Sequence, residues 1–155
     1  MTRVMPKRKP PIEPSTLTAA IEDVKRSYYI SEQRDYRRVD DEAIIDVIGR
    51  IEEISAAHKR HLGQQLDMTF VCARSFHQDQ PERDVERPSL FSVHLRGEQR
   101  SLMAYLPADA FWALASMIAS GEITHIEARF MPPRYGHGDL LSLYYRGPIE
   151  TATTA

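Results

Sequence analysis

The sequence predicts an α+β fold, in which a mostly antiparallel sheet of five or six strands packs against one internal helix. Apolar and polar residues alternate over several short runs, as in half-buried strands; these runs are 66–73, 91–96, 101–106, 123–130 and 140–146. One segment, 108–120, has helical spacing instead. Turn-forming glycines such as Gly97 and Gly138 separate the runs.

Composition indicates a soluble protein with one core. The chain has 155 residues, with 42% hydrophobic and 27% charged residues, which is ordinary for a globular domain. No apolar run approaches the roughly 18 residues of a membrane span. The N-terminus is basic and lacks the apolar stretch of a secretory signal, so we predict a cytoplasmic location. Cys72 is the single cysteine, and its apolar run predicts a buried small hydrophobe.

Charge is distributed unevenly along the chain. Basic residues outnumber acidic ones over residues 1–38, and acidic residues outnumber basic ones afterwards. Residues 1–14 are rich in proline and poor in apolar groups, so we expect a disordered basic arm. Residues 148–155 are expected to form a disordered tail. A basic arm can reach an anionic partner or can simply aid solubility.

The segment after the arm has helical spacing. Leu17, Ile21, Val24 and Tyr28 recur at intervals of three or four, which predicts an amphipathic N-terminal helix over 15–30. Residues 31–42 are dense in charge and are predicted to be a linker. The folded domain is then expected to span 43–147.

Residues 43–62 support two interpretations. Aspartates before the segment, a basic end and Gly63 after it favour a helix. Six of the residues in 44–54 are isoleucine or valine, and β-branched side chains favour a strand. Gly49 would cost a helix about 1 kcal/mol but suits a bent strand. We favour the strand.

The internal helix at 108–120 is well delimited. Pro107 is tolerated at a first-turn position, Asp109 favours the helix N-terminus, and Gly121 can end the helix. Phe111 and Leu114 belong to one apolar stripe, which must pack on the sheet.

Strand alternation separates two faces of the sheet. The positions predicted to face inward are Phe91, Val93, Leu95, Leu102, Ala104, Ile126, Ala128, Phe130, Leu141 and Leu143. The period of two then directs six polar or aromatic residues outward: His94, Arg96, Tyr105, Arg129, Tyr144 and Arg146. Arg134 and Tyr135 lie at a nearby strand end. These eight residues are the candidate ligand-binding site, because guanidinium groups bind phosphate and aromatic rings stack on bases. The same residue types are common in protein interfaces.

No motif of a known catalytic or cofactor site is present. The sequence contains no phosphate-binding glycine loop, nucleophile elbow or Cys-x-x-Cys. His58 and His61 could meet only on a helix, and no second ligand cluster accompanies them. We therefore predict a protein that is not an enzyme and has no cofactor or metal.

The run Asp46-Val47-Ile48-Gly49 resembles the first strand of OB-fold domains, in which a glycine lets the strand bend between sheets. The similarity would cover residues 43–147, with Gly121-Glu-Ile-Thr-His-Ile126 resembling a later strand. It implies an OB-like barrel and, by family function, single-stranded nucleic acid as ligand. The extra strand before the helix and the acidic body depart from that pattern.

A second similarity involves Arg34 and Arg38, which have the Arg-x-x-x-Arg spacing that opens PilZ domains. This resemblance implies binding of cyclic di-GMP, since two guanidinium groups can clamp phosphates. The second PilZ motif is not matched, because Glu53-Ile-Ser55-Ala-Ala-His58 differs from it at both ends.

The function predicted from the sequence is that of a non-catalytic binding or protein–protein interaction module. A protein partner or a second copy would dock on the helix at 15–30. Single-stranded nucleic acid on the arginine and tyrosine face is the alternative, and a degenerate PilZ-like site is a further one. No membrane partner is expected.

Overall fold

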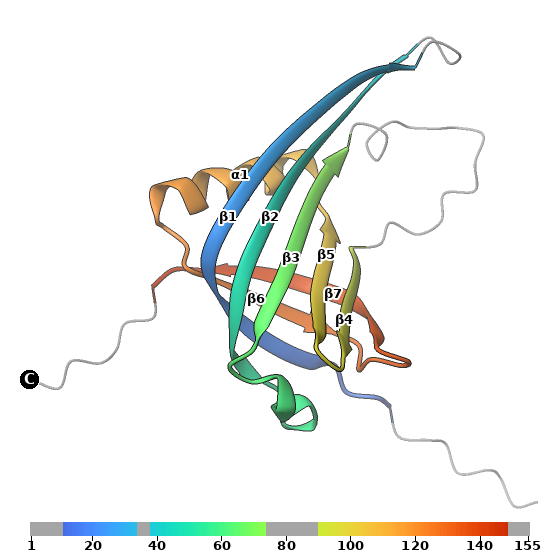
Figure 1. Ribbon diagram of the computed structural model, residues 1–155, viewed down its shortest axis with the longest axis vertical. Coiled ribbons are helices and arrows are strands. Elements are labelled where there is room, and N and C mark those ends of the chain that lie inside the picture. Colours follow the sequence, from blue (N-terminus) through green and yellow to red (C-terminus); the bar gives the residue numbers. More distant parts are fainter. Residues whose placement is uncertain (1–10, 34–37, 74–89, 149–155) are drawn as a thin grey trace, which may run out of the picture.

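The protein forms a closed β-barrel in the computed structural model, which describes residues 11–33, 38–73 and 90–148. Around the barrel the strands follow the order β1-β2-β3-β5-β4-β7-β6 (Figure 1). β3 and β5 pair in parallel, and the other neighbours are antiparallel. The strands are β1 (Ser15–Gln33), β2 (Arg38–Ile54), β3 (Gln65–Ala73), β4 (Phe91–Arg96), β5 (Gln99–Tyr105), β6 (His125–Phe130) and β7 (His137–Arg146). The fold is therefore a mostly β barrel, with one long helix in the described residues.

The expected helix at 15–30 is wrong, because Ser15–Gln33 is the long strand β1. Leu17 and Ala19 are buried at a period of two, but the pairing of β1 with β2 shifts register between Ile21 and Asp23. The extra residue of this β-bulge changes the phase, so that Val24 packs against the core next. A bulged strand therefore reproduces the intervals of three and four that are typical of a helix.

The charged segment 31–42 is not a linker where the structure describes it. Ser31 to Gln33 end β1, and Arg38 to Glu42 begin β2, with Glu32 opposite Val39. Figure 1 shows the paired ends of β1 and β2 extending beyond the rest of the barrel. We call residues 24–33 and 38–45 the hairpin arm. The barrel thus begins with Ser15 and not near residue 43.

The strand interpretation of residues 43–54 is confirmed by β2, and the helical alternative survives only as the short 3₁₀ helix η2 (Ala56–His61). Gly49 lies where strands approach closely. A Cβ at this position would come within 2.7 Å of Met68 Cε and 3.0 Å of the Ala20 carbonyl oxygen. The run Asp46–Gly49, which resembles the first strand of OB-fold domains, lies in the second strand of this barrel. The closed barrel is compatible with an OB-like expectation, although it has seven described strands instead of about five.

Helix α1 (Ala108–Ser120) confirms the predicted internal helix. It starts after Pro107 and ends at Gly121, whose φ of 76° is left-handed. Phe111 and Leu114 are buried in the same core as the barrel residues. In Figure 1, α1 passes behind β1 and β2 at the level where the hairpin arm leaves the barrel. Helix and barrel thus share one apolar core.

Inward and outward positions follow the predicted alternation except at two residues. Phe91 and Leu141 were expected inside, and each is 43% exposed. Leu141 turns outward because the β6–β7 register slips: Arg129 pairs with Ser142, and Phe130 with Leu140. Phe91 has a φ of 105°, so the backbone entering β4 departs from regular strand geometry. The remaining eight predicted inward residues belong to the core or pack against it.

The predicted disordered arm and tail fall mostly outside the described residues. This applies to residues 1–10 of the arm and to 149–155 of the tail. Arg34 of the PilZ-like pair also lies outside them, and the side chain of Arg38 is not described. Among the described residues, no helix is long and apolar enough to cross a membrane.

Candidate functional site

The turn between β6 and β7 brings two histidines together. His137 begins β7 and lies directly opposite His94 of β4 in the antiparallel ladder. Their Nδ1 atoms are 3.3 Å apart, and their ring centroids are separated by 4.3 Å. His137 is not among the eight site residues predicted from the sequence. The pattern Gly136-His137-Gly138 was the available signal, since glycines allow close backbone approach.

Both glycines are required by the packing of this turn. Gly136 has a φ of 88°, and a Cβ there would lie 3.0 Å from Arg96 Cβ and 3.3 Å from His94 Cε1. Its carbonyl oxygen accepts a hydrogen bond from the Leu95 amide at 2.9 Å. Gly138 is buried, and its added Cβ would clash with the Met131 carbonyl oxygen at 2.0 Å. The turn is thus fixed against β4.

Four of the eight predicted site residues gather at this turn. His94 and Arg96 come from β4, and Arg134 and Tyr135 from the turn itself. The Arg134 amide donates to the His137 carbonyl oxygen at 2.8 Å. Tyr135 is 93% exposed and has a φ of 52°. We call these four residues and His137 the turn cluster: it offers two guanidinium groups, two imidazoles and one solvent-facing ring.

The other four predicted residues lie apart from the turn cluster. Tyr105 is on β5, where its ring meets Phe91 edge-on at a centroid distance of 5.2 Å. Arg129, Tyr144 and Arg146 lie on the outer face of β6 and β7. Tyr144 is 64% exposed, but Arg146 forms an ion pair with Glu127 at 3.3 Å. The predicted residues therefore lie on the outside of the barrel, although His94, Tyr105 and Arg146 are only partly exposed, and they belong to different parts of the outer surface.

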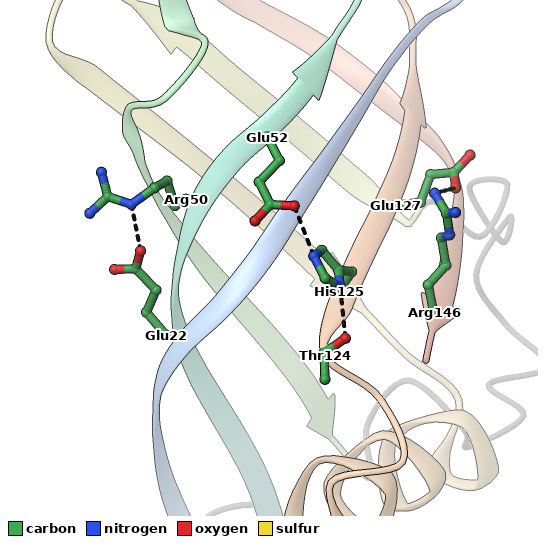
Figure 2. A network of polar contacts seen from close by, with 7 residues as sticks. All are labelled: Glu22, Arg50, Glu52, Thr124, His125, Glu127 and Arg146. Carbon is green, nitrogen blue, oxygen red and sulfur yellow. Dashed lines mark hydrogen bonds and ion pairs between the residues drawn. The ribbon is translucent and has the colours of Figure 1, made fainter. Parts of the chain in front are cut away.

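A network of polar contacts covers the outer face of β2, β1, β6 and β7 (Figure 2). Glu52 of β2 reaches His125 of β6, with Oε2 and Nε2 2.9 Å apart. Thr124 Oγ1 lies 2.7 Å from the other nitrogen, His125 Nδ1. This hydroxyl–imidazole–carboxylate chain spans β1, which pairs with both outer strands. These contacts cross the outer face of β1 and connect β2 with β6. The residues of the hydroxyl–imidazole–carboxylate chain line neither of the grooves described below.

An apolar groove of about 240 Å³ lies between the hairpin arm and α1. Trp112 forms its helix side and is 54% exposed. Its ring meets Phe111 edge-on at a centroid distance of 5.0 Å. Arg26 lines the groove and donates to the Ala115 carbonyl oxygen at 3.3 Å. The lining residues are Arg26, Ser27, Tyr28, Ala43, Ile44, Ile45, Phe111, Trp112 and Ala115.

The hairpin arm carries two more exposed apolar side chains, of which Ile30 lies on the same face of β1 as Tyr28 and Tyr29 lies on the opposite face. Tyr29 is 63% exposed, and Ile30 is 60% exposed. Exposed tryptophan, tyrosine and isoleucine next to a groove are unusual on a surface that faces only water, and they are common at interfaces. Sequence reasoning missed this groove because it treated residues 15–30 as a separate helix.

A second, polar groove of about 760 Å³ lies beside η2 and the β4–β5 hairpin. Arg60 and Arg100 line it together with Asp67 and Glu98, so its charges nearly balance. Arg100 also has structural partners, because it donates to the carbonyl oxygens of Gln65 at 3.2 Å and Gly97 at 3.0 Å. Such a groove has little net attraction for a phosphate group.

The two histidines of η2 are embedded in the barrel end. Burial lowers the pKa of His58 and of His61 below the usual value of 6.5, and the nearby Arg60 charge lowers both further. His58 Nε2 lies 3.0 Å from Ser15 Oγ. His61 is 1% exposed, and within the described structure neither of its ring nitrogens has a hydrogen-bond partner. Both imidazoles therefore favour the neutral form more than a free histidine does.

Cys72 lacks the environment of a reactive thiol. Burial raises its pKa, and the Asp41 carboxylate raises it further. The thiolate, which is the nucleophilic form, is therefore disfavoured.

Comparison of this chain with protein-family models, with curated proteins and with solved structures finds no match.

Proposed function

We propose that this protein is a non-catalytic interaction module that binds a segment of a partner protein in the groove between the hairpin arm and α1. The occupant we propose is an extended peptide segment that inserts an apolar side chain. The observation that carries this proposal is the half-exposed Trp112 at the edge of an apolar groove.

The size of the groove supports a side chain over a small-molecule ligand. Its volume of about 240 Å³ is below the range of about 300–1,000 Å³ that is typical of ligand and cofactor pockets. A side chain from a partner needs less room. Tryptophan and tyrosine are enriched among the residues that dominate binding energy at protein interfaces, and Trp112, Tyr28 and Tyr29 are all more than half exposed here.

The surroundings of the groove also favour a peptide. Arg26 stands at its rim with a guanidinium group that already donates to the Ala115 carbonyl oxygen. A partner segment with an acidic residue beside its apolar anchor would complement this charge. The hairpin arm extends the contact surface through Ile30, which lies two residues from Tyr28 on the same face of β1, and this gives the segment room to lie along the arm.

A peptide selection tests this function. Peptides from a displayed random library are selected on the full chain and then measured against Trp112→Ala. We expect a consensus with an apolar anchor and binding that is lost in Trp112→Ala. Tyr144→Ala is the matched control, because Tyr144 is an exposed aromatic residue outside the groove. Peptides that bind Trp112→Ala and the native chain equally would contradict the proposal.

A second candidate function is binding of single-stranded nucleic acid at the turn cluster. Arg96, which packs against Gly136, and Arg134 belong to the same turn cluster as the almost fully exposed Tyr135 and support it, because such sites pair cations with stacking platforms. A labelled oligonucleotide titrated at low and near-physiological salt measures this activity by fluorescence anisotropy. We expect affinity to fall as salt rises.

The matched variants for this second function are both arginines. Arg134→Ala should weaken oligonucleotide binding, while Arg50→Ala should not, since Arg50 is engaged with Glu22 at 2.6 Å on another part of the barrel. Absence of binding at low salt, where the electrostatic attraction is strongest, would end this candidate.

A further inference from the structure

We propose that His94 and His137 form a binding site for a divalent late transition-metal ion, Zn²⁺ or Cu²⁺, on the outer face of the barrel. The site is independent of the groove between the hairpin arm and α1. It rests on the distance between the two Nδ1 atoms, on the backbone that sets this distance, and on the chemistry of imidazole.

The spacing of the two nitrogens suits ligands of one ion. Their Nδ1 atoms are 3.3 Å apart. Two imidazole nitrogens bound to tetrahedral zinc at 2.0–2.1 Å are separated by about 3.3–3.4 Å. The same distance also allows a hydrogen bond between the two rings in the free protein. An ion would bind both nitrogens once the rings, whose centroids are 4.3 Å apart, rotate until both lone pairs point at it.

The backbone holds the pair in place. His94 and His137 are directly opposite each other on paired strands, so their side chains share one face of the sheet. Gly136 packs against His94, and Gly138 fits against the Met131 carbonyl oxygen where no side chain could. Ligands on a rigid scaffold lose less freedom when an ion binds.

The proton balance of binding is simple. In the free pair at neutral pH, at most one Nδ1 can carry the hydrogen that lies between the rings. When the ion takes the lone pairs of both Nδ1 atoms, that hydrogen moves to Nε2 of the same ring. This shift of a hydrogen between the two nitrogens of one ring needs no oxidant or reductant.

The surroundings decide which ion fits. No group of three or more histidine, cysteine, aspartate or glutamate side chains that could hold a metal occurs among the described residues. The ion would thus have two protein ligands and water at its other positions. Nearby Arg96 and Arg134 oppose a cation, whereas Asp139, two residues along β7, favours one. Imidazole ligands select Cu²⁺ and Zn²⁺ over Mg²⁺ or Ca²⁺.

Zinc titration of the untagged full chain tests the site. We expect saturable binding of one ion by calorimetry and a change at Nδ1, not Nε2, of His94 and His137 in long-range proton–nitrogen spectra. Loss of outer-shell support alone usually costs about 10–100-fold in metal affinity, so His94→Ala and His137→Ala should each lose at least about tenfold.

The matched control is His125→Ala, since His125 is also a strand histidine but is bound to Glu52 and Thr124. It should keep the affinity of the native chain. Circular dichroism shows whether each variant is folded. If a variant is not folded, the nitrogen spectra of the native chain still test the site, because they need no variant. Absence of a change at the two Nδ1 atoms under saturating zinc, or equal loss of affinity in all three variants, would overturn the proposal.

Discussion

At the residue scale, the glycines of the β6–β7 turn determine what the surface can do. His137 lies opposite His94, between Gly136 and Gly138. A Cβ at Gly136 would press on the Arg96 and His94 side chains, and a Cβ at Gly138 would clash with the Met131 carbonyl oxygen. The sequence showed a glycine-rich turn and exposed His94, Arg96 and Tyr135, but it did not show the pairing of β4 with β7. That pairing joins residues about forty positions apart, which alternation within a single strand does not reveal.

Gly138→Ala should lower the free energy of unfolding by about 1–3 kcal/mol, the usual range for overpacking. The physical reason is that the added Cβ would lie 2.0 Å from the Met131 carbonyl oxygen, and backbone cannot move aside as a flexible side chain can. Chemical denaturation followed by circular dichroism measures the change. Ser142→Ala, at an exposed position of the same strand, is the control and should remain within about 0.5 kcal/mol.

Stability should decrease as pH falls from 7.5 to 5.5, in part because of His61. Its folded pKa lies below the usual 6.5, owing first to burial and then to Arg60. The unfolded chain therefore binds more protons in this range, so stability is fully present above about 6.5 and declines below it. Denaturation midpoints at several pH values measure the slope.

His61→Leu should flatten this pH dependence. It removes the buried imidazole, whose two nitrogens have no described partner, and replaces it with an apolar group that needs none. An unchanged slope in His61→Leu would show that His61 does not carry the effect.

At the element scale, β1 shows most clearly where sequence reasoning fails. Its register shift between Ile21 and Asp23 places an extra residue in β1 and converts a period of two into spacing that suits a helix. The same reasoning succeeds where pairing is regular, as in β4 and β5, and where end signals are strong, as at Pro107 and Gly121 of α1. A bulge depends on the neighbouring strand, so one strand's sequence does not encode it alone.

Leu114→Ala should destabilise the fold far more than Trp112→Ala. Leu114 is fully buried in the shared core, and truncation of such a leucine costs about 2–5 kcal/mol. Trp112 is 54% exposed, so its removal leaves the core filled. Thermal and chemical unfolding of the two variants measure this difference. If Trp112→Ala were as damaging as Leu114→Ala, Trp112 would be a folding residue and not a binding one.

At the scale of the whole molecule, the barrel separates two surfaces. The turn cluster lies on β4 and at the start of β7, whereas the apolar groove lies between the hairpin arm and α1. The sequence predicted the antiparallel strands and the internal helix. It did not predict barrel closure through β1, because β1 joins β6 across more than a hundred residues. The groove exists only as a consequence of that closure, and so it could not be found from the sequence.

The most direct test of the interaction function uses the single tryptophan of the chain. Trp112 lines the groove, so its fluorescence reports on occupation without any label. The measurement is a titration of the full chain with a selected tryptophan-free peptide. We predict a saturable shift of the emission to shorter wavelength, as the half-exposed indole is covered. Peptide binding established by calorimetry without any change in Trp112 emission would place the contact elsewhere and contradict the account.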